Sequence, residues 1–214
     1  INSATFDAAG DTNFLNTGTV TLGNGGDVLT FAGGLATTGN PTNPALVNAA
    51  GTINTTGTRM DIGAVTLTGD TTFDTGNAAL GVMNIGAVTS GGFKLTLDSG
   101  STAGATMNLT SMVNGTGGLI IRDAGGLATI GDVGSAGGGV ITITDSQDGV
   151  TFNANVDATT FTIIDTAAGK AITFADGQDV DITTAFDVLG VGGYNVAINS
   201  ATFDAAGDTN FLNT

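Results

Sequence analysis

The sequence contains no cysteine, no histidine and no tryptophan. Without cysteine, disulfide bonds and thiolate metal sites are excluded. Without histidine or cysteine, the usual bases and nucleophiles of acyl-transfer enzymes are missing, and a serine would need a lysine partner. The chain offers only Lys94 and Lys170, neither in a recognisable motif. We therefore predict that the protein is not an enzyme. A polysaccharide-acting β-helix enzyme that uses paired aspartates is the less favoured alternative.

Positive charge is also scarce. Lysine and arginine total 4, against 19 acidic residues that are all aspartate, and the net charge is −15. Because binding to phosphate backbones requires clustered lysine or arginine, this balance argues against nucleic acid as a partner. An acidic surface favours solubility and attracts cations. No apolar run reaches the ~18 residues that a membrane-spanning helix needs, so we predict no membrane span in this segment.

Good helix formers are nearly absent, since glutamate is missing and lysine and arginine are rare. Threonine, valine, isoleucine and phenylalanine, which suit a pleated strand, are common. Short runs alternate apolar and polar residues, for example Val65–Leu67 and Val140–Ile143, and many are separated by glycine, asparagine or aspartate. Apolar residues make up 41% of the chain, which is too many for a disordered one. The composition predicts an ordered all-β protein with frequent tight turns.

The sequence INSATFDAAGDTNFLNT opens the chain as residues 1–17 and recurs unchanged as residues 198–214. The offset between Ile1 and Ile198 is 197 residues. We interpret residues 1–197 as one unit of a tandem repeat, and residues 198–214 as the start of the next unit. A seamless repeat with no linker indicates an extended object in which each unit contacts the next.

A shorter and more degenerate period lies inside the unit. The sequence IGAVT at residues 62–66 recurs at residues 85–89, an offset of 23. FKLTLDSG at residues 93–100 resembles VITITDSQ at residues 140–147, an offset of 47, about twice as long. A period of ~22–23 residues divides the unit into roughly nine coils, and at ~4.8 Å per coil the unit would be ~40 Å long. We therefore predict a parallel β-solenoid, with residues 40–50, which contain Pro41 and Pro44, forming a loop outside the regular body.

Tandem immunoglobulin-like β-sandwiches are the alternative fold. Such modules also form long surface proteins, but their strands are usually longer and their cores carry a tryptophan or tyrosine. This chain has a single tyrosine, no tryptophan and 36 glycines. These features favour the solenoid.

The segments GTVTLGNGGDVLTF, IGAVTLTGDTTFDTG and GGVITITDSQDGVTF resemble, in their general sequence pattern, the secreted regions of filamentous-haemagglutinin-type and autotransporter-type surface proteins. The resemblance implies a β-helix that forms stalks, fibres or adhesive surfaces outside a prokaryotic cell. We therefore expect an extracellular filament or giant cell-surface fibre whose main partner is itself, end to end and in lateral bundles. A module that binds carbohydrates or cell surfaces is the alternative function.

No cofactor is required by this interpretation, but calcium is the best chemical hypothesis. The segment LGNGGDVLT, which contains Asp27, fits most of the fixed positions of a calcium-binding nonapeptide in a single copy. A second acidic cluster contains Asp176, Asp179 and Asp181. Carboxylates and turn carbonyls are the hard oxygen ligands that calcium prefers. The alternative is that these aspartates cap turns before strands.

Overall fold

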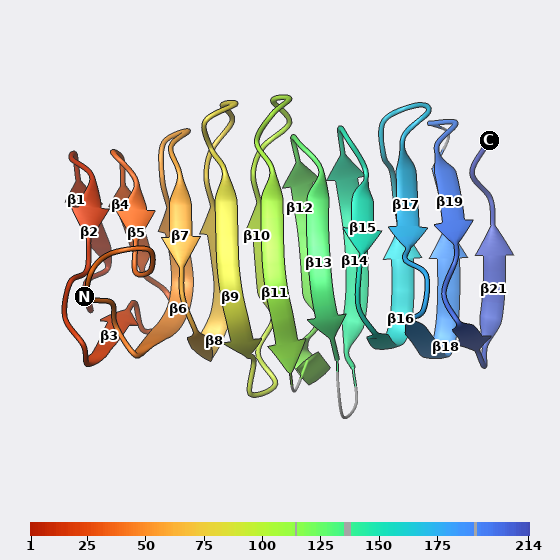
Figure 1. Ribbon diagram of the computed structural model, residues 1–214, viewed down its shortest axis with the longest axis horizontal. Coiled ribbons are helices and arrows are strands. Elements are labelled where there is room, and N and C mark those ends of the chain that lie inside the picture. Colours follow the sequence, from red (N-terminus) through yellow and green to blue (C-terminus); the bar gives the residue numbers. More distant parts are fainter. Residues whose placement is uncertain (114, 135–137, 191) are drawn as a thin grey trace.

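The computed structural model describes residues 1–113, 115–134, 138–190 and 192–214. Strands account for almost all of its regular structure, and the only helical element among the described residues is a single 3₁₀ turn, η1 (Gly115–Gly117). Every strand pairing in this part of the chain is parallel. The strands stack in chain order along one long axis, with the two termini at opposite ends (Figure 1). The protein is therefore a parallel β-solenoid of about nine coils, as predicted.

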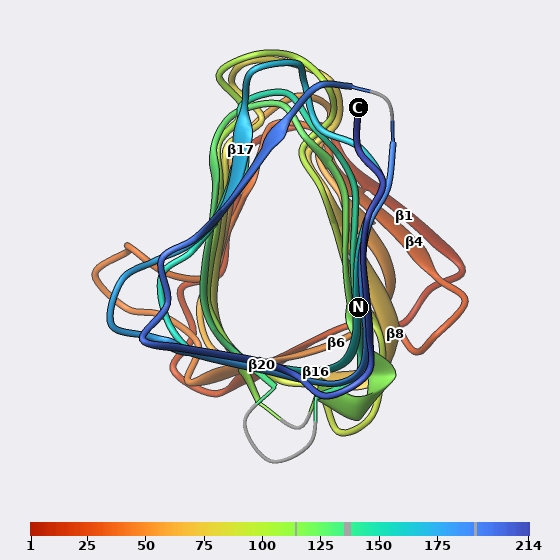
Figure 2. The same ribbon diagram turned by 90° about the vertical axis from the view of Figure 1, so that its right-hand side faces the viewer.

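Viewed along its axis, each coil is a triangle with three strand-bearing sides (Figure 2). We call these sides face A, face B and face C, in the order in which the chain passes through them. Several long strands bend around a corner and contribute to two faces.

Face A consists of β3 (Thr19–Leu22), the first parts of β6 (Leu46–Asn54) and β8 (Val65–Asp74), the second parts of β9 (Met83–Thr89), β11 (Met107–Val113) and β13 (Ala128–Val133), the first parts of β16 (Val156–Ile163) and β18 (Asp179–Val188), and β20 (Thr202–Ala205).

Face B consists of β1 (Thr5–Ala8), β4 (Val28–Phe31), the second parts of β6 and β8, β10 (Leu95–Asp98), β12 (Leu119–Ala124), β14 (Val140–Ser146), the second parts of β16 and β18, and β21 (Asp208–Phe211).

Face C consists of β2 (Thr12–Asn13), β5 (Leu35–Ala36), β7 (Met60–Ile62), the first parts of β9, β11 and β13, β15 (Val150–Phe152), β17 (Ala171–Phe174) and β19 (Asn195–Ile198).

The core is a column of apolar side chains that fills the triangle along its length. Successive residues of a strand point to opposite sides, so the alternation of the sequence sends one set inward. In β16, for example, Val156, Ala158, Phe161 and Ile163 are buried, while the intervening residues are exposed or half-buried. Like residues stack on like: Met60 pairs with Met83, which pairs with Met107. Burying a large apolar side chain contributes roughly 1.5–3 kcal/mol, so the interior supplies most of the stabilisation.

Coil length varies, and the stacking register is kept along most of the chain but shifts at bulges, for example after Leu97. The stretch of chain from Thr52 to its stacked partner Thr72 is shorter than the stretch from Leu35 to its partner Met60. The echo of IGAVT in the sequence is confirmed as one coil, because Ile62 stacks under Ile85. The prediction of a loop over residues 40–50 is wrong for its second half, because β6 begins at Leu46. The parallel pairing excludes immunoglobulin-like sandwiches, which are antiparallel.

Candidate functional site

The two ends of the solenoid carry the duplicated sequence. In the first coil, β1 and β2 belong to residues 1–17 and pair with β4 and β5 of the following coil. In the last coil, β20 and β21 belong to residues 198–214 and pair with β18 of the preceding coil. Among the described residues, each of these four strands has a partner on one side only. One copy is thus seen with its following neighbour and the other with its preceding neighbour.

The first copy forms backbone hydrogen bonds with the following coil, for example at Ala8, Thr12 and Phe14. The carbonyl of Ala8 accepts from the amide of Ala32 at 2.8 Å. The amides of Thr12 and Phe14 donate to the carbonyls of Gly34 and Ala36 at 3.0 and 2.9 Å. All three bonds point toward the following coil.

The second copy forms backbone hydrogen bonds with the preceding coil. The amide of Ala206, which corresponds to Ala9, donates to the carbonyl of Ile182 at 2.9 Å. The amide of Leu212, which corresponds to Leu15, donates to the carbonyl of Val188 at 2.7 Å. The bonds named here use different backbone groups of the segment in the two copies. The two sets of bonds are therefore compatible, and together they describe one coil covered on both sides.

One glycine of the segment also has different surroundings in the two copies. A Cβ atom built on Gly10 would meet nothing within 4 Å. On Gly207, the same residue in the second copy, it would lie 1.5 Å from the carbonyl oxygen of Thr184. Glycine is thus required at this position only when a preceding coil lies beneath it.

Aromatic side chains line the inner side of both ends. The rings of Phe6 and Phe31 have centroids 5.4 Å apart. At the other end, Phe203 lies 5.2 Å and Phe211 5.7 Å from Phe186 by the same measure. Phe211 is 54% exposed because no further coil covers it. Each end therefore presents apolar surface together with unpaired strand edges, a combination that promotes association.

Acidic side chains form a column on the side of the rod. The stacking register places Asp74 under Asp98, Asp98 under Asp123 and Asp123 under Asp145, all on face B. Burial, with a further contribution from the neighbouring Asp98 carboxylate, raises the pKa of Asp74 and of Asp123 above the ordinary value of 3.8. Asp98 is compensated by Arg122, whose guanidinium nitrogen lies 3.4 Å from a carboxylate oxygen. A shallow groove of about 240 Å³ runs beside this column.

A second acidic column lies on face A near the C-terminal end. Asp157 stacks under Asp181, and Asp181 under Asp204. Burial, followed by the charges of Asp181 and Asp132, raises the pKa of Asp157 above 3.8. Strands about 4.8 Å apart hold these carboxylates close together. Both columns can therefore attract cations from solution.

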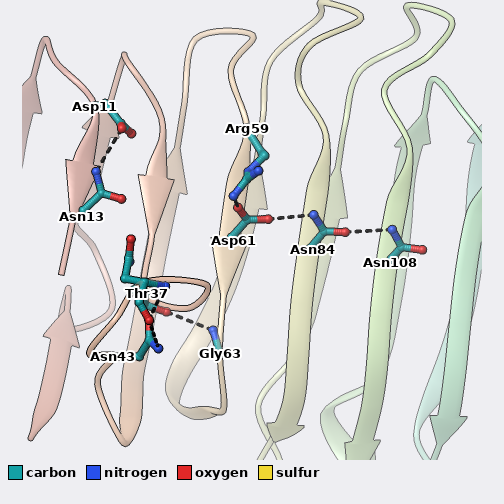
Figure 3. Close-up of polar contacts among 10 residues, drawn as sticks. Asp11, Asn13, Thr37, Asn43, Arg59, Asp61, Gly63, Asn84 and Asn108 are labelled. Atoms are coloured by element: carbon teal, nitrogen blue, oxygen red, sulfur yellow. Dashed lines mark hydrogen bonds and ion pairs between the residues drawn. The ribbon is translucent and has the colours of Figure 1, made fainter. Parts of the chain in front are cut away.

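Face C carries a ladder of amides instead (Figure 3). Asn84 donates from Nδ2 to Oδ1 of Asp61 at 2.7 Å, and Asn108 donates in the same way to Asn84 at 2.8 Å. Arg59 forms an ion pair with Asp61. Each asparagine of the ladder thus donates to the side chain one coil earlier.

The aspartates predicted to bind calcium lie in two separate places, in line with the two clusters of the sequence. Asp27 lies just before β4, near the N-terminal end, and is buried. Asp179 and Asp181 lie in β18, where Asp179 accepts a 2.7 Å hydrogen bond from the hydroxyl of Thr202, and Asp176 lies just before that strand. Among the described residues, no group of three acidic side chains is arranged to hold a metal ion. Calcium binding stays a prediction, and a lower melting temperature in the presence of a chelator would support it.

Of the face B aspartates, the sequence points only to Asp145, which together with Asp148 forms a third acidic cluster in DSQDGV. Their signal is a degenerate one: FDTG, LDSG, RDAG and TDSQ recur at residues 73–76, 97–100, 122–125 and 144–147. The echo of residues 93–100 in residues 140–147 aligns Asp98 with Asp145, and the structure adds that Asp74 and Asp123 belong to the same column.

In the part of the chain that the structure describes, no helix is long and apolar enough to cross a membrane. Comparison of the chain with protein-family models, with curated proteins and with solved structures finds no match.

Proposed function

We propose that this protein is a structural one: a stiff extracellular filament or giant cell-surface fibre, built from tandem units that each correspond to residues 1–197 and without enzymatic activity. The observation that carries the proposal is the complementarity of the two duplicated segments. Ala8 bonds to the following coil, whereas Ala206 bonds to the preceding coil. A segment that satisfies both neighbours lets one unit continue into the next without a linker.

Continuation also removes the two weak points of an isolated solenoid. A bare strand edge and an exposed Phe211 at one end become the interior of the rod when the next unit covers them. Because each coil contacts only its neighbours, the rod can lengthen with the number of units at constant width. The function of the repeat would then be to build a long and stiff rod.

The side of the rod supports a surface role. Acidic columns keep neighbouring rods apart at low salt, and divalent cations could bridge them into bundles or a matrix. The resemblance to secreted adhesins favours a location outside a prokaryotic cell. Carbohydrate binding is the weaker alternative, since the groove beside Asp74 and Asp98 is lined by polar residues and glycines, without the aromatic side chains on which sugars usually stack.

The test measures length against the number of units. Chains of one, two and four units are compared by small-angle scattering and electron microscopy. We expect a rod of constant width that gains about 40 Å per unit, from roughly nine coils of ~4.8 Å. Separate beads joined by flexible segments would refute the proposal.

A proline substitution provides the matched control. Ala206→Pro removes the amide that bonds to Ile182 and should loosen the junction. Ala9→Pro in the first unit alters the same residue at an end where no preceding coil is bonded, so the rod should keep its length.

A further inference from the structure

The two copies of the duplicated segment lie on different faces of the solenoid. Thr5–Ala8 form β1 on face B, whereas the identical Thr202–Ala205 form β20 on face A. Thr12 and Asn13 pair on face C, whereas their equivalents in Asp208–Phe211 pair on face B. Figure 2 shows β20 on a different side of the triangle from β1.

The start of the segment shows the same displacement. The carbonyl of Ile1 accepts from the amide of Gly23 at 2.8 Å, directly after β3 on face A. Its equivalent Ile198 stacks on Phe174 on face C. All three parts of the segment have therefore moved by one face, and in the same direction.

The displacement follows from the number of coils in a unit. Face B leads from β1 through β4, β6, β8, β10, β12, β14 and β16 to β18, which is eight complete coils. Two more faces, formed by β19 and β20, lead to the second copy. One unit, from Thr5 to the equivalent Thr202, is thus eight and two-thirds coils.

We propose that consecutive units of the filament are turned by one face, a third of a revolution, relative to each other. The partner is a second copy of this unit, and the inference rests on the proposed function above. The strand that follows Thr202–Ala205 in the stack would be residues 28–31 of the next unit, because residues 28–31 already cover the first copy. Three units would complete 26 coils, over about 125 Å at ~4.8 Å per coil, before the same face returns.

The columns of outward-facing side chains are consistent with this proposed junction between two units. Asp204 ends the acidic column of face A, and its equivalent Asp7 lies under Thr30. The column would thus continue through Thr30 and Asn54 of the next unit into the aspartates that begin at Asp74. The acidic column of one face runs into the acidic column that the next unit carries on its own face B.

A side-chain bond between coils also occurs at the second copy. Asn210 donates from Nδ2 to Oδ1 of Asp187, one coil earlier, at 2.8 Å. Its equivalent Asn13 lies on face C under Ala36, which interrupts the column one coil before Asp61 and Asn84. The aromatic interior also joins, since Phe203 packs against Phe186 and its equivalent Phe6 against Phe31.

Disulfide formation tests the register in the 214-residue chain, which has no cysteine of its own. Thr202→Cys combined with Asp179→Cys, and separately Thr5→Cys combined with Val28→Cys, join residues that are stacked in register. Stacked Cα atoms about 4.8 Å apart lie within the range of a disulfide. We expect both pairs to cross-link on mild oxidation. Thr202→Cys with Asp187→Cys, on a neighbouring face, is the control that should stay reduced.

A long chain of identical units then tests the rotation by electron cryo-microscopy at a resolution that separates the coils. We expect each unit to reach the next after eight and two-thirds coils, with every feature displaced by one face. A continuous rod in which units repeat on the same face overturns the rotation and leaves the proposed function intact. Beads instead of a rod overturn the proposed function. Loss of either expected cross-link also overturns the rotation, because the two copies would no longer lie on different faces.

Discussion

Asn84 donates a hydrogen bond from its side-chain amide to the carboxylate of Asp61 at 2.7 Å, although 23 residues separate them in the sequence. Asp61 is buried, so the loss of this donor leaves a carboxylate oxygen less well satisfied. We expect Asn84→Ala to lower the free energy of unfolding by about 1–2 kcal/mol. Asn108→Ala, which removes an exposed donor to Asn84, should cost less, about 0.5 kcal/mol. Urea denaturation measures both, and equal losses would contradict the ladder.

The duplicated glycine gives a second pair of variants. Gly207→Ala places a methyl group against the backbone of Thr184 and should release the last coil. Gly10→Ala meets open space and should leave the protein unchanged. Hydrogen exchange in residues 202–211 is the measurement, with faster exchange expected only for Gly207→Ala. In a two-unit chain, Gly10→Ala in the second unit should act as Gly207→Ala does here.

The acidic column predicts an unusual dependence on pH. Burial, reinforced by nearby carboxylates, raises the pKa of Asp74 and Asp123 above 3.8 in the folded protein. Their protons are thus bound more tightly in the folded than in the unfolded state. This stabilisation is complete below the unfolded pKa and is lost as the pH rises through the folded pKa.

These carboxylates should therefore make the protein melt at a higher temperature near pH 4 than near pH 7. Asp123→Asn should raise the melting temperature at neutral pH and flatten the profile. Asp208→Asn, in the exposed strand β21, is the control and should leave the profile as it is. A wild-type profile that rises steadily from pH 4 to pH 7, unchanged by Asp123→Asn, would refute the prediction.

The aromatic interior predicts a large difference between two phenylalanines. Phe174 is buried and its ring centroid lies 5.4 Å from that of Phe152. Phe174→Ala should cost about 3–5 kcal/mol in free energy of unfolding, because the surrounding strands cannot close the cavity. Phe211→Ala, at a position that is 54% exposed, should cost under about 1 kcal/mol in the 214-residue chain. Thermal and urea denaturation distinguish the two.

Much of this fold could be predicted from local pattern. The alternation in runs such as Val65–Leu67 indicates strands, and the IGAVT echo gives the coil length in one place. The echo between residues 93–100 and 140–147 also marks stacked segments, since Asp98 stacks under Asp123 and Asp123 under Asp145. These signals are visible because neighbouring coils impose the same inward and outward pattern on one another.

The columns and the rotation could not be predicted in the same way. They depend on the sum of all the coil lengths, which vary with the turns between faces. A bulge after Leu97 moves Asp98 opposite Asp123 instead of Arg122, and no local pattern indicates it. The nonapeptide around Asp27 is a local motif, and a match to it does not say which other acidic residues lie near Asp27 in the folded protein.

The two-thirds of a coil by which each unit exceeds eight coils also determines what happens when the gene gains or loses a unit. Exact repeats recombine, so a gene that encodes such an array gains and loses whole units readily. In the proposed filament, each gain or loss would swing everything beyond it by a third of a turn about the axis, in addition to changing its reach. Only a change by a multiple of three units would leave the faces beyond it in their former orientation. Copy number would therefore set orientation as well as distance.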